Sequence, residues 1–302
     1  MTQVVYKIKK KFNSFVLVTF LATLIILLIL GVIFYDIISQ GISHLSWEFL
    51  CDKPAEEIRM GGIFPAIFGT ALLVLVMTVA VVPIGVITAI YLHEYAKNNK
   101  LTRLIRVAVN NLAGVPAIVF GLFGLGFFIQ FIGHGIDNMF YGGEIVYGRP
   151  AIIWASLTLA LLTLPVVIVT TEEALRNISK DIREASFALG ATKFQTIMRI
   201  IIPNCLSGII TGAILAISRG AGEVAPILFT GAADLLPKLP TSLSDQFMDL
   251  KFHIFVLAQS PDVKNSTPVL YSTVLVLLLL IFILNLIAFI LRSQLRRKFK
   301  SH

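Results

Sequence analysis

Two ionisable residues, Arg219 and Glu223, lie in a run of mostly small and apolar residues. An ionisable side chain inside a bilayer costs roughly 2.5–3.5 kcal/mol on insertion scales, so it usually faces water or protein. The two residues are four positions apart, which places them on one face of a helix where they can pair. A guanidinium is a planar fork of donors that suits a tetrahedral oxyanion. We therefore expect either an anion contact on a translocation path, with Glu223 holding Arg219 in place, or an ion pair that fixes helix packing.

Small residues recur along the segment that leads to Arg219. Gly208, Gly212, Ala216 and Gly220 follow one another every four residues. Lipid gives no hydrophobic drive for helix association, so small residues on one face let membrane helices approach closely. We expect this span to be central in the bundle. Arg219 would then lie about 22 Å along the helix from Asn204, at 1.5 Å per residue, in the outer half of the membrane.

The composition places the chain in the membrane class. Of its 302 residues, 57% are hydrophobic and 14% are charged, and the mean hydropathy is +0.87. A transmembrane helix needs about 20 apolar residues, since lipid cannot pair with backbone polar groups. Six segments meet this condition, at residues 14–35, 64–92, 107–131, 151–170, 204–232 and 268–291. The predicted fold class is an all-α integral membrane protein with six transmembrane helices.

The distribution of charge predicts the orientation. Most of the 25 lysines and arginines lie at the two ends of the chain and in the loops after the second and fourth spans. Cytoplasmic segments carry an excess of Lys and Arg, so both termini are predicted to be cytoplasmic. The net charge of +8 is attributed to this topology and to contact with membrane lipid, and no nucleic-acid partner is expected.

The sequence lacks the patterns of common catalytic and metal sites. It contains no G-x-x-x-x-G-K-[ST], G-x-S-x-G or H-E-x-x-H. The five histidines have no metal-ligand spacing, and Cys51 and Cys205 are predicted on opposite sides of the membrane. Glu172 and Glu173 are interpreted as a solvated helix face rather than an acid/base pair. We therefore expect no enzymatic activity, no catalytic residue, no metal and no cofactor.

A charged segment, 171–203, separates the fourth and fifth apolar stretches. It contains Glu184-Ala185-Ser186-Phe187-Ala188-Leu189-Gly190 and then Ile200-Ile201-Ile202-Pro203. This pattern resembles the E-A-A-x-x-x-G-x9-I-x-L-P loop of ABC importer permeases, with Ser186 for the second Ala and Ile202 for Leu. The resemblance implies a short coupling helix, containing Glu184 and Ala185, that docks on an ATPase subunit. We expect Glu184 near the start of a helix and Gly190 in a turn between two short helices.

Further stretches narrow the resemblance, at residues 61–67, 114–124, 171–176 and 218–231. They are similar to the phosphate-specific, PstA-type members of the binding-protein-dependent transport system permease family. The resemblance implies the type I ABC importer permease (MetI-like) fold and a role for Arg219 and Glu223 in phosphate passage. It divides the chain into 1–63 (basic segment, first helix and outer loop), 64–291 (the permease core of five helices) and 292–302 (a basic tail).

The implied function is that of a permease subunit that carries phosphate across the cytoplasmic (inner) membrane by alternating access. Its implied partners are a homologous second permease subunit, a cytoplasmic dimer of ATP-binding subunits and an extracytoplasmic phosphate-binding protein. A permease for sulfate, molybdate or phosphonate would share the fold, and only the resemblance distinguishes the ions. A secondary anion transporter is a more distant alternative, because it needs coupling acids within its spans and Glu223 is the one clear candidate.

Overall fold

A computed structural model describes residues 2–54, 61–97, 99–233 and 236–300 of the chain. The described part is almost entirely helical, with one short pair of parallel strands. Its elements are α1 (Thr2–Gly41), η1 (Ile42–His44), α2 (Trp47–Cys51), α3 (Phe64–Ile90), η2 (Tyr91–Tyr95), α4 (Lys100–Leu112), α5 (Ala117–Phe123), η3 (Gly124–Gly133), α6 (His134–Phe140), α7 (Ile152–Arg176), α8 (Lys180–Ala188), α9 (Lys193–Thr196), η4 (Ile197–Ile201), α10 (Ile202–Gly222), α11 (Ile227–Thr230), β1 (Ala232–Ala233), β2 (Phe247–Met248), α12 (Leu250–Ala258) and α13 (Val263–Lys300). Three of the η elements, η2, η3 and η4, are π-helical.

Six helical runs in the described residues are long and apolar enough to cross a membrane, as predicted. They are Phe15–His44, Phe64–Tyr95, Ala117–Phe140, Ile152–Arg176, Lys193–Gly222 and Ser266–Gln294. The predicted boundaries of the third and fifth spans are wrong at both ends, and the first span ends at His44 rather than at residue 35.

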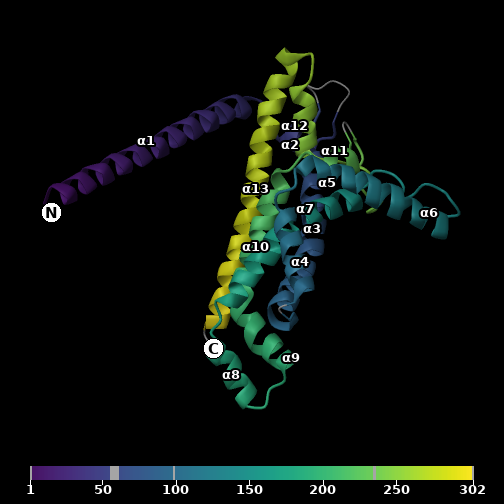
Figure 1. Ribbon diagram of the computed structural model, residues 1–302. Coiled ribbons are helices and arrows are strands. Elements are labelled where there is room, and N and C mark those ends of the chain that lie inside the picture. The colour runs from purple at the N-terminus through teal and green to yellow at the C-terminus, as the bar shows by residue number, and fades with distance from the viewer. Residues whose placement is uncertain (1, 55–60, 98, 234–235, 301–302) are drawn as a thin grey trace.

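The third span begins at Ala117 rather than at residue 107. Residues 100–112 form a separate helix, α4, which ends in a turn where the Gly114 N–H donates to the Asn111 carbonyl. Pro116 follows, and a proline disfavours helical backbone at the residue before it. The chain therefore cannot continue from α4 into α5 as one straight helix, and Figure 1 shows α5 and α6 leading away from the axis of α4.

The fifth span begins at Lys193 and ends at Gly222, whereas residues 204 and 232 were predicted. Its first turns come from α9 and η4, which run without a break into α10. The helix ends because two glycines, poor helix formers, occupy its last turn and Pro226 follows closely. Glu223 already has extended backbone, with φ −88° and ψ 124°.

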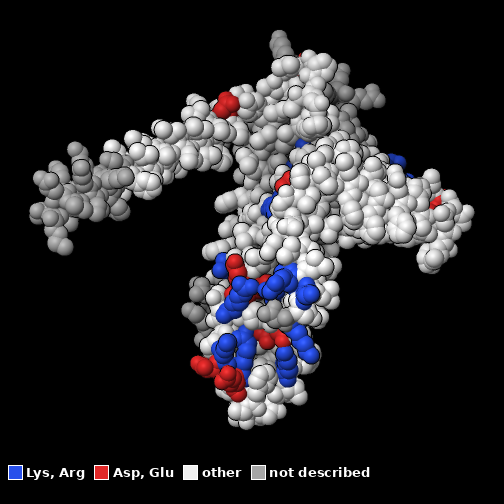
Figure 2. Space-filling model, in the orientation of Figure 1, with Lys and Arg blue, Asp and Glu red and all other residues white. Residues whose placement is uncertain are grey.

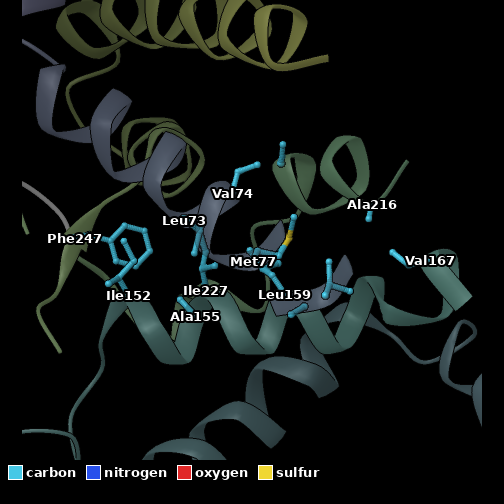
Figure 3. Close-up of a cluster of buried hydrophobic side chains, with 13 residues drawn as sticks. Leu73, Val74, Met77, Ile152, Ala155, Leu159, Val167, Ala216, Ile227 and Phe247 are labelled. Carbon is cyan, nitrogen blue, oxygen red and sulfur yellow. The ribbon is translucent and has the colours of Figure 1, made fainter. Parts of the chain in front are cut away.

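The centre of the bundle is formed by α3 and α7, which pack along one another, and by α10, which packs on both. Figure 3 shows Leu73 and Met77 of α3 meeting Leu159 of α7 within one cluster of buried apolar side chains. Since lipid is as apolar as these residues, their contribution is close van der Waals packing rather than removal from water.

The predicted stripe of small residues lies at these contacts. A side chain at Gly208 would overlap Ala174 of α7, and one at Gly212 would overlap Thr170. Farther along, a side chain at Gly220 would overlap Met77 of α3. The expectation that the fifth span is central in the bundle is therefore confirmed.

The first helix leaves the bundle, as Figure 1 shows. Its described side chains from Phe15 to Tyr35 are exposed. In the part of α1 whose side chains are described, the C-terminal turns attach the helix to α13. The Tyr271 hydroxyl donates to Asp36 at 2.9 Å, and the Ser272 hydroxyl donates to the Gly41 carbonyl at 2.7 Å.

Candidate functional site

Arg219 lies in the last turn of α10 and is partly buried. A cation suits this position, because the C-terminal end of a helix carries partial negative charge. Among the residues that the structure describes, none forms a hydrogen bond or an ion pair with its guanidinium. An arginine inside a span with its donors uncommitted can bind an anion that enters the bundle.

The predicted pairing of Arg219 with Glu223 is wrong. The expected shared helix face requires α10 to continue through residue 223, but the helix ends at Gly222. Glu223 is partly buried on extended backbone, and no contact within 4.0 Å joins its carboxylate to a described cation. An ion pair between the two residues therefore does not account for their presence.

The backbone that carries Arg219 is held on both sides. The Ser218 hydroxyl donates to the Asn285 side chain of α13 at 2.8 Å. On the next residue, Gly220 packs directly against Met77 of α3. Arg219 thus projects from a turn that is fixed between two other spans, which limits the freedom of its Cα.

Charged side chains gather at one end of the bundle, around α4, α8 and α9 (Figure 2). We call this the basic end, and it includes η2 as well. The segment 171–203 lies here, and it folds into the short helix α8 and, after a turn, into α9, which continues into α10 and is not the second separate short helix that was expected. Gly190 lies between α8 and α9 with φ +82°, a left-handed conformation that glycine adopts without strain. The predicted turn is confirmed.

The α8–α9 segment is held in one shape by polar contacts. The Ser186 and Thr196 hydroxyls lie 2.8 Å apart in a buried contact between the two helices. Thr192 and Gln195 form a capping box at the start of α9. Glu184 lies in the second turn of α8, where Asp181 occupies the first turn, so its predicted place near the helix start is wrong.

Large apolar side chains are exposed around the Gly190 turn. Leu189 is 90% exposed, and four others are exposed nearby: Ile182, Phe187, Phe194 and Met198. Ala185, in the same segment, is exposed as well. Such a patch among charged residues is typical of a protein–protein contact surface.

A second charged cluster at the basic end joins α4 to α7. The Glu172 carboxylate lies 3.3 Å from Arg106 and 3.9 Å from Arg176, and Arg106 also donates to the Leu92 carbonyl at 2.8 Å. The interpretation of both glutamates as a solvated face is wrong for Glu172, which is buried, and right for Glu173, which is exposed. The sequence alone gave no signal for this contact, because its partners lie far apart along the chain.

A central bundle of α3, α7 and α10, six apolar spans and a projecting pair of short helices define a multi-pass membrane permease of the type I ABC importer (MetI-like) fold. Residues 81–301 match the family model of the binding-protein-dependent transport system inner membrane component. The chain belongs to this family.

Individual relatives agree with this assignment. The chain is 33% identical to the phosphate transport system permease protein PstA of Yersinia pestis, over 93% of this chain and 90% of that protein. It is 37% identical to the probable ABC transporter permease protein YqgI of Bacillus subtilis (strain 168), over 70% of this chain and 67% of that protein. In structure, it resembles a chain of a bacterial alginate ABC transporter, with a TM-score of 0.65, 14% identity, and coverage of 95% of this chain and 96% of that one.

Proposed function

We propose that this chain is the transmembrane permease subunit of an ATP-driven importer that carries inorganic phosphate across the cytoplasmic membrane by alternating access. The observation that carries the proposal is the match, over nearly the whole chain, to a permease protein of a phosphate transport system. The uncommitted guanidinium of Arg219 supports it, because a planar fork of donors suits a phosphate oxyanion.

The proposed orientation places the basic end and both termini in the cytoplasm. This follows the excess of Lys and Arg at that end (Figure 2). Arg219, in the last turn of a helix that starts at the basic end, then lies toward the outer side of the membrane. Phosphate released from an extracytoplasmic binding protein would meet Arg219 early in its passage. Glu223, on a separate segment of backbone, would limit how tightly the anion is held.

The α8–α9 segment is the proposed docking surface for the ATP-binding subunits. The segment projects from the bundle (Figure 1), and it carries the exposed apolar patch around Leu189. ATP hydrolysis is assigned to those subunits, because the chain has no phosphate-binding loop pattern. A second, homologous permease would complete the pathway beside the core at 64–291. The exposed first helix provides apolar surface for that partner or for lipid.

The test is uptake of radiolabelled phosphate by cells that depend on this importer. Arg219→Gln should lower uptake at least about tenfold, since one good charge-assisted contact is worth a factor of that order. Arg219→Lys, which keeps the charge but loses the fork, should retain more uptake than Arg219→Gln. Arg199→Gln is the matched control, because Arg199 is exposed and makes no ion pair with the described residues.

Membrane level and co-purification of the ATP-binding subunit should be unchanged in all three variants. Normal uptake by Arg219→Gln would exclude an anion contact at this residue. Excess unlabelled phosphate should abolish uptake of the label, whereas excess sulfate should not. Competition by sulfate would refute the assignment of phosphate as the transported ion.

A further inference from the structure

The end of the second span is held by the α8–α9 segment. Arg183 of α8 donates to one carboxylate oxygen of Glu94 in η2, from Nη2 at 3.0 Å and from Nε at 3.3 Å. The side chains are only 15% and 9% exposed, respectively. Shielding from water strengthens such a charge-assisted pair. His93 Nδ1 lies 3.2 Å from the same oxygen.

The same arginine also binds the end of the fourth span. Its Nη2 donates to the Leu175 carbonyl at 2.9 Å, and its Nη1 donates to the Ile178 carbonyl at 2.7 Å. The last carbonyls of a helix lack partners within the helix, so a guanidinium is well suited to bind them. One side chain of α8 therefore connects three elements, namely α8, the end of α7 and η2.

A second contact reaches the same place from the other side of the Gly190 turn. Lys193, the first residue of α9, donates from Nζ to the Glu94 carbonyl. Its ammonium also lies over the Tyr95 ring, 4.9 Å from the ring centroid. Both short helices of the segment thus hold η2, one through the Glu94 side chain and the other through its backbone.

We propose that the Arg183–Glu94 contact is the joint through which displacement of α8 moves the second and fourth spans together. The proposal rests on the proposed function, since it assumes that a partner pushes or pulls on α8. The fifth span needs no such joint, because α9, η4 and α10 form one continuous helical run. The second span is connected to α8 through the chain only over a long stretch, since Glu94 and Arg183 are 89 positions apart in sequence, so its movement depends on contacts of this kind.

The joint predicts which part of the cycle fails when it is broken. Without Arg183, α8 can still dock and α10 can still follow it, but α3 and α7 lose their polar connection to α8. ATP would then be hydrolysed without the full rearrangement of the pathway. Arg183 is a positioning residue in this account, and it does not contact the transported ion.

The experiment uses the complete importer in proteoliposomes with its binding protein, and it measures phosphate transported per ATP hydrolysed. For Arg183→Gln we expect this ratio to fall about tenfold, a typical coupling between distant sites, while basal ATP hydrolysis persists. Glu94→Gln should lower the ratio in the same direction. Arg183→Lys should keep a higher ratio of phosphate transported to ATP hydrolysed than Arg183→Gln, and Arg199→Gln should leave this ratio unchanged. A purely structural role would lower the yield of complex without changing this ratio.

A distance measurement tests the joint without reference to any transported ion. Spin labels at Asp181→Cys in α8 and Val79→Cys in α3, both exposed, are introduced with the exposed Cys51 changed to Ser. In the labelled complex with Arg183 intact, the distance between the two spin labels should stay constant on ATP binding. In the labelled complex that also carries Arg183→Gln, this distance should change on ATP binding. An equal change in both complexes, or an unchanged transport ratio in Arg183→Gln and Glu94→Gln, would overturn the joint. Failure of the unmodified complex to import phosphate would instead refute the proposed function.

Discussion

Lys251 and Asp249 form a buried ion pair whose two partners should respond very differently to mutation. The Lys251 ammonium lies 3.5 Å from an Asp249 oxygen, and the side chains are 1% and 0% exposed. The lysine nitrogen has no hydrogen-bond partner in the described residues. Asp249 is better satisfied, since it accepts from the Thr70 hydroxyl at 3.1 Å and from the backbone N–H groups of Lys251 and Phe252 at 2.9 and 3.2 Å.

Asp249→Asn keeps a side-chain oxygen that can cap α12 but removes the charge that faces Lys251. An uncompensated buried charge costs about 3–5 kcal/mol, so we expect a loss of stability in that range. Lys251→Met should cost less, about 1–2 kcal/mol, because Asp249 retains three donors. The double variant should lie within about 1 kcal/mol of the unmodified protein, since replacing a whole buried pair is often neutral.

The assay is reversible unfolding in mixed detergent micelles with increasing sodium dodecyl sulfate, followed by circular dichroism. The four proteins form a double-mutant cycle, and we expect a coupling of at least about 2 kcal/mol. Glu144→Gln is the control, because Glu144 is exposed and forms no ion pair with the described residues. A greater loss for Lys251→Met than for Asp249→Asn, or additive single losses, would refute the reasoning.

Three further predictions concern packing, a turn and a loop. Gly212→Leu should destabilise the protein by about 1–3 kcal/mol in the same unfolding assay, because it overpacks α10 against α7. Gly126→Leu is the control, since nothing lies within 4 Å of a side chain placed there, and equal losses of stability in the two variants would contradict the packing argument. Gly190→Val should strain the left-handed turn by about 1–2 kcal/mol and reduce co-purification of the ATP-binding subunit, whereas Gly190→Asn should be tolerated. Normal co-purification of that subunit with the Gly190→Val variant would argue against a docking role for the α8–α9 segment. Backbone hydrogen bonds, of which the one from Ser242 has the largest effect, lower the pKa of Asp245. The contribution of Asp245 to stability is therefore present above the unfolded-state pKa of about 4 and is lost as the pH falls through the pKa in the native state. The stability difference between the native protein and Asp245→Asn should therefore shrink in acid, and a difference independent of pH would refute this.

Hydrophobic runs predicted the number and kind of spans because length and apolarity are properties of local sequence. Two of the boundary errors, at the start of the third span and at the end of the fifth, have a common cause. Pro116 and Pro226 each follow a helix that has just ended, and the hydrophobicity of the surrounding residues does not reveal that end. The stripe of small residues correctly predicted a helix contact, because the spacing of Gly208 and Gly212 alone places them on one face of the helix.

The candidate site was less predictable. The spacing of Arg219 and Glu223 implies a pair only while the helix lasts, and the helix ends one residue too early. The turn at Gly190 could be predicted, because a left-handed position between short helices favours one residue type. The contacts of Arg183 with Glu94 and of Arg106 with Glu172 could not, since no local pattern connects residues so distant in the chain.

The attachment of the first helix to the last has a consequence for the order of synthesis. Asp36 meets its partner in α13, Tyr271, which is 235 positions later in the chain. At 5–20 residues per second, a ribosome needs roughly 10–50 s to reach Tyr271 after it has added Asp36. During this time the emerging α1 has only lipid, an insertion factor or another polypeptide beside it. A chain cut short before Tyr271 would keep the first helix but lose the anchor that fixes it to the rest of the molecule.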